Sequence, residues 1–151
     1  MEPMTPTDIY SQLTRDEGGC VLHVYPDSKG IKTVYVGHNL EANPLPDLNF
    51  TLAQGLQVLQ DDVTRITAQL LKAIPWMVAF QQKEPVRFGV FQNMAFNMGA
   101  GGVMAFHHAL ADTQAGNYLQ ASLDMMNSLW YHQVGARAER LCQQMRTGVW
   151  V

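Results

Sequence analysis

Three residues near the N-terminus could together break a glycosidic bond: Glu17, Asp27 and Thr33. Glycoside hydrolysis needs two carboxyl groups, one donating a proton to the leaving oxygen and one staying ionised to act on water or on the sugar. A glutamate packed where a helix meets a sheet loses hydration, which favours its neutral form, whereas an aspartate on an open turn stays charged. Spacing alone does not select this set, because such carboxylates are common as surface and turn residues.

The local sequence predicts how these residues are positioned. The apolar spacing within Thr7–Glu17 indicates a helix, and Gly18 is a typical stop signal. The segment Val21–Val36 is rich in β-branched and aromatic residues and is interrupted by the turn residues Pro26–Gly30, which predicts an antiparallel hairpin. Glu17 then ends the helix, Asp27 lies in the turn and Thr33 lies on the second strand.

The rest of the chain reads mainly as helix. A loop is expected over Asn43–Asp47, and then Thr51 and Gln54 form a capping-box pattern that opens a long helix ending before Pro75. Its apolar residues recur at three- and four-residue steps: Leu52, Leu56, Leu59, Val63, Ile66, Leu70 and Ile74. Pro85 suits the first turn of the next helix, which carries Phe88, Phe91, Met94, Ala95 and Met98 and breaks at Gly99–Gly102. Shorter helices are expected around Val103–Ala111, Tyr118–Met126 and Arg137–Met145.

These elements predict an α+β fold in which the strands are segregated. We expect one domain over residues 1–151, with a β lobe over about 18–50, a connecting helix over 51–74, and a helical lobe made of 1–17 with 75–151. Such an arrangement would leave a cleft between the two lobes, and clefts of that kind commonly bind ligands.

Composition and charge exclude several classes of function. The chain has 151 residues, of which 47% are hydrophobic and 15% charged, which is typical of a globular protein. The formal net charge of −3 argues against a nucleic-acid-binding protein. We find no membrane span and no signal-peptide pattern. Cys20 and Cys142 are expected to be free thiols, and their isolation predicts no metal site.

Three sequence blocks surround the candidate residues: Arg15–Gly18, Tyr25–Gly30 and Thr33–His38. These blocks resemble the signature around the catalytic residues of the phage-type lysozymes of glycoside hydrolase family 24. Later blocks follow in the family's order: Asn93–Gly99, Ser128–Tyr131, Arg137–Arg140 and Arg146–Trp150. The resemblance covers nearly the whole chain and implies a lysozyme-like fold with a glycan-binding cleft and no cofactor.

The resemblance also implies the residue roles. Glu17 would be the general acid, Asp27 would orient or activate the attacking water, and Thr33 would assist it. The relatives that the chain most resembles invert the anomeric configuration, for which the two carboxyl groups lie about 6.5–9.5 Å apart.

Further residues match supporting and substrate-binding positions of the family. His38 and Asp62 match an ion pair, and Arg137 matches a basic residue near the catalytic glutamate, where a cation would resist its protonation. The expected cleft-lining residues are Phe96, Asn97, His132 and Gln133. Each has a simpler alternative: His38 as a purely structural residue, Phe96 as core, Asn97 as a helix cap and Arg137 as part of a solvated face.

The chain departs from the family pattern at three places. One extra residue separates Glu17 from Asp27, and it lies within Gly18–His23, where it could form a bulge or displace Asp27. Tyr35 stands where the family usually has glycine, so it could narrow the cleft or provide a stacking surface for a sugar. Leu129 replaces a position that is often basic.

The leading functional prediction is an endolysin that cleaves the β-1,4 bond between N-acetylmuramic acid and N-acetylglucosamine in peptidoglycan. Such an enzyme would work as a monomer, reside in the host cytoplasm before lysis and reach the periplasm through a holin. Two alternatives stay open: a non-catalytic peptidoglycan-binding module on the same scaffold, and a virion-associated lysozyme.

Overall fold

The computed structural model describes residues 5–151, which fold into a small antiparallel sheet and eight helices. This combination confirms the predicted α+β class. The chain divides into two compact units: unit 2 is Tyr10–Arg65, and unit 1 joins Ile66–Val151 to the N-terminal residues up to Ile9. The predicted division into β lobe, connecting helix and helical lobe stays a prediction, and its first four residues lie outside the described residues.

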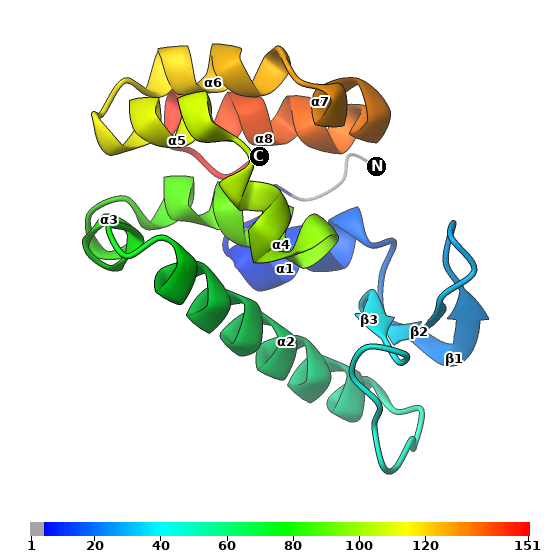
Figure 1. Cartoon of the computed structure of the whole chain (residues 1–151). Helices are drawn as coiled ribbons and strands as arrows, with labels where there is room; N and C mark the ends of the chain where they lie inside the picture. The colour runs from blue at the N-terminus through cyan, green and yellow to red at the C-terminus, as the bar shows by residue number, and fades with distance from the viewer. Residues whose placement is uncertain (1–4) are drawn as a thin grey trace. The chain divides into compact units, whose positions relative to one another are not determined.

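Unit 2 holds the helix and the hairpin that the sequence predicts. Helix α1 spans Ile9–Asp16, and the sheet has the order β1-β2-β3 with antiparallel neighbours, as Figure 1 shows in blue and cyan. The strands are β1 Val21–Pro26, β2 Lys32–Tyr35 and β3 His38–Asn39.

A bulge in β1 accommodates extra chain between the predicted catalytic carboxylates. Val21 pairs with Tyr35 and Tyr25 pairs with Thr33, so four residue steps on β1 face two on β2. The irregularity lies between Val21 and Tyr25 and therefore overlaps the segment in which the sequence places the insertion. Regular pairing resumes at Tyr25, next to the turn that carries Asp27.

Helix α2 spans Leu52–Ala73 and begins as predicted, although the capping box is only half formed. The Gln54 amide donates to Oγ1 of Thr51 at 3.2 Å, which caps the helix. The reciprocal bond of the predicted box is missing because the Thr51 amide donates instead to Oδ1 of Asn49 at 3.1 Å. The Gln54 side chain bonds to the Asp47 carbonyl, the Asn49 amide and the Tyr35 hydroxyl. Two expected core residues of this helix, Leu52 and Leu56, are exposed.

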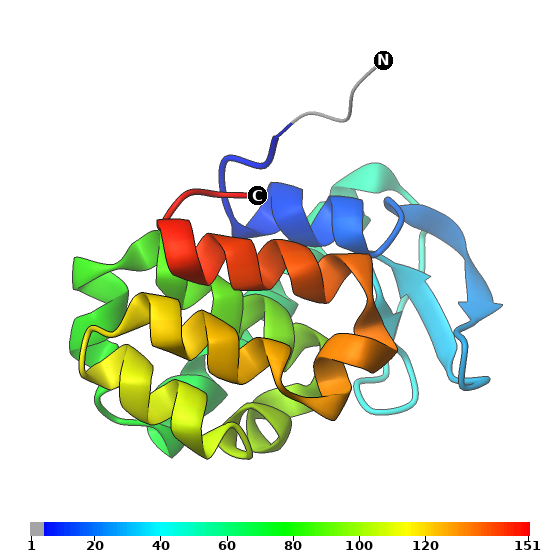
Figure 2. The same cartoon turned by 90° about the horizontal axis from the view of Figure 1, so that it is seen from above.

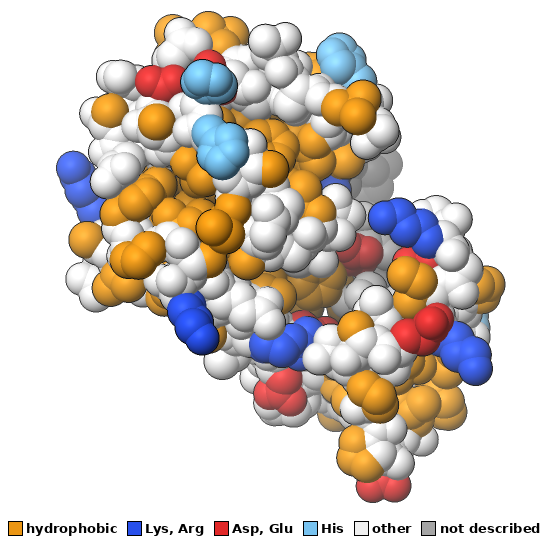
Figure 3. All heavy atoms as spheres, in the orientation of Figure 1, with side chains coloured by type: hydrophobic (Ala, Val, Ile, Leu, Met, Phe, Trp, Pro, Cys, Tyr) orange, Lys and Arg blue, Asp and Glu red, His pale blue; other side chains and the backbone are white. Residues whose placement is uncertain are grey.

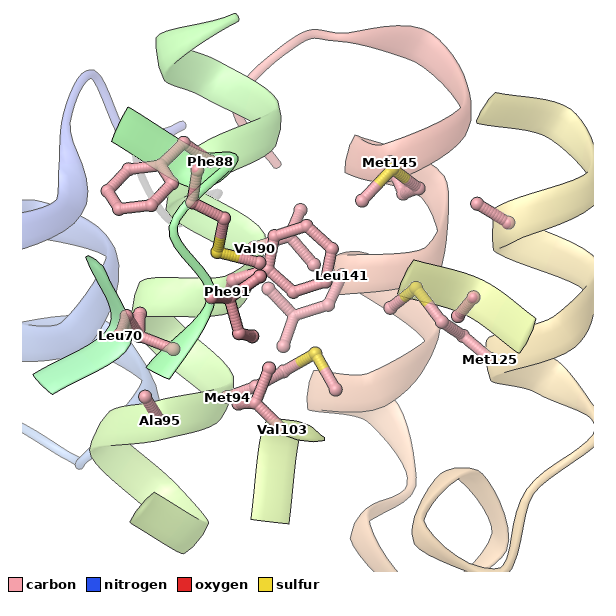
Figure 4. Packing of buried hydrophobic residues seen from close by; sticks show 14 of the residues in the cluster. Leu70, Phe88, Val90, Phe91, Met94, Ala95, Val103, Met125, Leu141 and Met145 are labelled. Carbon is pink, nitrogen blue, oxygen red and sulfur yellow. The ribbon is translucent and has the colours of Figure 1, made fainter. Parts of the chain in front are cut away.

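Unit 1 is built from helices around one apolar core. Its helices after α2 are α3 Met77–Lys83, α4 Pro85–Met104, α5 His107–Gln114, α6 Tyr118–Met126, α7 Leu129–Val134 and α8 Ala136–Thr147. Within this unit, α6 packs beside both α5 and α8 (Figures 1 and 2). Figure 4 shows side chains from α4, α6 and α8 meeting in the core, among them Phe91, Met125 and Leu141.

Three helical details differ from the sequence-based expectation. The short helices α3 and α7 were not predicted, because each is too short to show a full apolar period. The expected helix over Val103–Ala111 is interrupted, since α4 ends at Met104 and α5 begins at His107. The break expected at Gly99–Gly102 is confined to Gly99, whose φ is 79°, after which the helix continues. No helix among residues 5–151 is long and apolar enough to cross a membrane.

Candidate active site

Glu17 lies directly after α1, where two glycines turn the chain toward the sheet. Its amide donates to the Leu13 carbonyl at 2.9 Å, which extends the helical hydrogen-bond pattern by one residue. Gly18 and Gly19 then take positive φ angles of 84° and 102°, which end the helix. The Glu17 side chain is half-buried, and it lies against Gly37 so closely that a Cβ atom there would be 2.7 Å from Oε2.

Asp27 organises the turn between β1 and β2 with one of its two carboxylate oxygens. Oδ1 accepts hydrogen bonds from the amides of Lys29 and Ile31, each at 2.8 Å. Within residues 5–151, Oδ2 of Asp27 has no hydrogen-bond partner. Asp27 therefore keeps one fixed oxygen and one available acceptor, which is the arrangement that a water-positioning carboxylate needs.

Thr33 is buried on β2 and is linked to Asp27 through Ile31. Its hydroxyl donates to the Ile31 carbonyl at 2.8 Å, and the same carbonyl accepts the Asp27 amide at 2.9 Å. Because its proton is committed to that carbonyl, the Thr33 oxygen retains lone pairs that can accept a hydrogen bond from water.

Tyr25 is influenced by the charges of both Glu17 and Asp27. The sequence predicted no role for this tyrosine. Burial raises the pKa of Tyr25, and the nearby negative charges of Glu17 and Asp27 raise it further. Both carboxylates are therefore near enough to Tyr25 for their charges to raise the pKa of its phenol. Tyr25 also faces Thr33 across the strand pair. Strand alternation could have indicated this pairing, but the bulge hides the register.

Tyr35 is buried, not exposed on a sugar-binding surface. The side chain is 1% exposed and packs with Val34 and Val58. Its hydroxyl donates to Gln54 and accepts from the Phe50 amide at 3.1 Å. The backbone φ of Tyr35 is 57°, in the left-handed region that favours glycine. These contacts assign Tyr35 to packing, and its role in substrate binding stays a prediction.

His38 and Asp62 form the predicted ion pair inside unit 2. Nδ1 of His38 lies 2.7 Å from Oδ2 of Asp62, and Nε2 lies 2.7 Å from the Asn43 carbonyl. Burial opposes the charged imidazole, but the hydrogen bonds to Asp62 and Asn43 and the Asp62 charge outweigh it and raise the pKa of His38. Arg65 also pairs with Asp62 at 2.9 Å, and its charge lowers the pKa of His38. The histidine thereby ties β3 to α2.

The remaining predicted site residues belong to unit 1. Arg137 is half-buried at the start of α8, and its Nε donates to Oδ1 of Asn93 at 2.8 Å. Asn93 is fully buried. The sequence did not indicate that it positions Arg137, because the two residues are far apart in the chain. Phe96 packs partly against the core, whereas Asn97 is exposed one residue later on α4. His132 and Gln133 are exposed on α7. No cluster of three potential metal ligands occurs within residues 5–151.

A family model described as phage lysozyme matches residues 15–146 of this chain. The chain belongs to the phage lysozyme family. The matched range includes every residue predicted for the site, from Glu17 to Arg137, so the family assignment covers both units.

Two similar proteins differ in how much of their own length matches this chain. The pre-baseplate central spike protein Gp5 of Enterobacteria phage T4 is 25% identical over 163 residues, covering 95% of this chain and 28% of the spike protein. The chain therefore spans about a quarter of that relative's length. A probable T4-type lysozyme 1 of Dictyostelium discoideum is 22% identical over 163 residues, covering 94% of this chain and 95% of the relative.

Proposed function

We propose that this protein is a muramidase that hydrolyses the β-1,4 bond between N-acetylmuramic acid and N-acetylglucosamine in peptidoglycan. The observation that carries the proposal is the match to the phage lysozyme family over residues 15–146, a range that includes Glu17, Asp27 and Thr33. Family membership alone would support a lysozyme-like hydrolase. The proposal assigns the chemistry to the carboxyl groups of Glu17 and Asp27.

In the proposed mechanism, Glu17 is the general acid. Its carboxyl proton passes to the glycosidic oxygen as the bond between that oxygen and the anomeric carbon breaks. A water molecule attacks the anomeric carbon from the opposite face, which inverts the configuration. Asp27 accepts a hydrogen bond from this water through Oδ2 and takes its proton, so both carboxyl groups change protonation state once per cycle. The Thr33 oxygen accepts a hydrogen bond from the second hydrogen of the water, which stays on the new hydroxyl group of the product.

Residues of unit 1 would bind the glycan in this proposal. Phe96, Asn97, His132 and Gln133 would contact sugars, and Arg137, whose side chain is held by Asn93, would supply a positive charge for the glycan-binding site. The protein would act as a monomer without a cofactor or metal, and it would need neither nucleic acid nor membrane insertion.

A non-catalytic binding module has less support than an enzyme. Two sequence departures favoured it, the insertion and Tyr35. The bulge accommodates extra chain before Tyr25, and the Tyr35 ring is buried away from solvent. Neither feature therefore gives a reason for Glu17 and Asp27 to be inactive.

A virion-associated lysozyme is the second candidate, and the similarity to a phage spike protein favours it. The free endolysin would accumulate in the host cytoplasm and act in the periplasm after a holin releases it. Mass spectrometry of purified virions separates the two: peptides of this chain in stoichiometric amounts would indicate the virion-associated form.

The bond that is cleaved can be identified chemically. Purified peptidoglycan is digested, the new reducing ends are reduced with borohydride, and the products are hydrolysed to single sugars. We expect muramitol as the new product. Glucosaminitol alone would mean that the other glycosidic bond is cleaved, and release of neither would contradict the proposal.

A further inference from the structure

Tyr25 lies on the same face of the sheet as Thr33. The two residues are directly opposite each other in the pair of strands β1 and β2. Side chains at opposite positions of an antiparallel pair share a face, with Cβ atoms about 4.5–5.5 Å apart. Asp27 follows two residues after Tyr25, and all of these residues belong to unit 2, as does Glu17. The Tyr25 ring therefore lies beside the residues that would hold the attacking water.

The hydroxyl group of Tyr25 is not engaged by the protein. Within residues 5–151 it makes no hydrogen bond to another residue. Burial and the negative charges of Glu17 and Asp27 raise the pKa of Tyr25, so the phenol keeps its proton. The side chain is half-buried, which leaves part of it accessible to a ligand. Tyr25 therefore offers an available hydrogen-bond donor close to both carboxylates.

The Tyr25 ring is supported by a neighbour on its own strand. His23 lies two residues earlier on β1, and the two ring centres are 6.3 Å apart with their planes at 65°. This is an edge-to-face contact, one of the arrangements that aromatic pairs prefer. His23 itself is exposed. The contact restricts the directions in which the phenol can point, although no other residue binds its hydroxyl group.

The other side chains of the proposed site would not supply a donor to a bound sugar. Glu17 would give its proton to the glycosidic oxygen, and an ionised Asp27 can only accept hydrogen bonds. The proton of Thr33 is committed to the Ile31 carbonyl. Sugar hydroxyl groups can adapt to such acceptors, because a hydroxyl both donates and accepts. An acetamide carbonyl can only accept, and of these four side chains Tyr25 has the one uncommitted proton.

Long-range charge attraction would contribute little to recognition of the glycan. The formal net charge of the chain is −3, and peptidoglycan is itself anionic. On the face that Figure 3 shows, the Lys and Arg side chains of each unit stand apart from one another and form no basic patch. Selectivity would therefore have to come from individual hydrogen bonds and ring contacts, which makes an available donor at the cleavage point significant.

We propose that Tyr25 is a substrate-binding residue whose phenol donates a hydrogen bond to the acetamide carbonyl of the sugar bound between Glu17 and Asp27. This inference rests on the proposed function, in which both sugars of the cleaved bond are N-acetylated. A site that hydrogen-bonds one group of its substrate discriminates against an analogue that lacks the group, because the protein donor is then left unpaired. Tyr25 would thus make the enzyme selective for N-acetylated glycan.

The test compares two soluble tetrasaccharides by calorimetric titration into Glu17→Gln protein, with and without Tyr25→Phe. One is the alternating fragment of N-acetylglucosamine and N-acetylmuramic acid, and the other is the same fragment without its acetyl groups. We expect Tyr25→Phe to weaken binding of the acetylated fragment about five- to ten-fold, as loss of one hydrogen bond would. Binding of the deacetylated fragment should change by less than about two-fold. Equal weakening for both fragments, or none for either, would overturn the proposal.

Stability measurements separate a substrate contact from a structural one. Because the Tyr25 hydroxyl has no partner within residues 5–151, Tyr25→Phe should leave the urea unfolding midpoint unchanged, and a clear decrease would contradict the proposal. Tyr10→Phe is the matched control at an exposed tyrosine of α1, and it should alter neither binding nor stability. Since binding is measured in the Glu17→Gln background, it can succeed even if the wild-type protein proves inactive, and the two proposals fail separately.

Discussion

Gly37 forms the wall against which the Glu17 carboxyl group rests. A Cβ atom at residue 37 would lie 2.7 Å from Oε2 and 2.8 Å from Cδ of Glu17, closer than real contacts allow. The φ of Gly37 is 58°, so glycine is favoured there by its backbone conformation as well. The proposed general acid therefore depends on a residue that carries no chemistry itself.

Gly37→Ala is expected to lower activity at least about ten-fold by displacing this carboxyl group, because small misplacements of a catalytic group are costly. Gly30→Ala is the matched control. Its φ is 80° and a Cβ there would meet nothing within 4 Å. Both variants should lose about 1–2 kcal/mol of stability from the left-handed conformation. Equal activities of the two folded variants, measured as reducing-end release, would contradict this role of Gly37.

The His38–Asp62 pair should make stability depend on pH. The pKa of His38 is raised in the folded protein, so its contribution is complete below about pH 6.5 and declines as the pH rises through the folded-state pKa. Asp62→Asn should cost about 3–5 kcal/mol where the histidine is charged and less at higher pH. Urea unfolding of wild type and of Asp62→Asn, at pH values from 5.5 to 9, measures the free energy of unfolding of each protein.

The exposed neighbour Asp61 provides the control for this pair. Asp61→Asn should change the free energy of unfolding by less than about 0.5 kcal/mol at every pH, as surface substitutions usually do. The difference in free energy of unfolding between wild type and Asp62→Asn should shrink as the pH rises. If it stays constant or grows, the charged state of His38 does not stabilise the fold.

Tyr35→Phe separates packing from sugar binding. Loss of the hydroxyl leaves the Phe50 amide and the Gln54 side chain without their partner, and should cost about 1–3 kcal/mol of stability. KM should not change, because the ring is buried. Tyr10→Phe, at an exposed tyrosine, should change neither quantity. A stable Tyr35→Phe variant with raised KM would restore the substrate-binding role expected from the sequence.

The two thiols should react at very different rates. Burial raises the pKa of Cys142 to about 12, so almost no thiolate exists at pH 8. Cys20 is half-buried, and burial raises its pKa too. Mass spectrometry after iodoacetamide treatment of the folded protein should show slow labelling at Cys20 and none at Cys142, with both labelled in urea. Equal labelling in the folded protein would contradict the burial of Cys142.

Local sequence signals predicted the elements that carry Glu17, Asp27 and Thr33. The helix before Gly18, the hairpin around the Asp27 turn and α2 after Thr51 all form, because glycine and turn residues at their ends and apolar spacing within them are local properties. The predicted roles of these residues came from the family resemblance, since spacing alone did not distinguish them from ordinary surface carboxylates.

Interactions between distant residues account for what the sequence did not predict. Gln54 leaves the expected capping box because the Tyr35 hydroxyl and the loop before α2 bind its side chain. Asn93 acquires its role from Arg137, and Tyr25 acquires its role from two carboxylates on other elements. Apart from Asp27, which is two residues from Tyr25, these partners lie more than one helical turn away in sequence, so no periodicity reveals them.

The most direct test of the central claim is the initial rate of reducing-end release from purified peptidoglycan by wild type and by Glu17→Gln. Circular dichroism and thermal unfolding should first show that the variant is folded. Loss of a general acid typically costs a factor of about 10²–10⁴, and the proposed mechanism predicts a decrease of at least about 100-fold. A folded Glu17→Gln protein that cleaves at the wild-type rate, or a wild-type protein that releases no reducing ends, would contradict it.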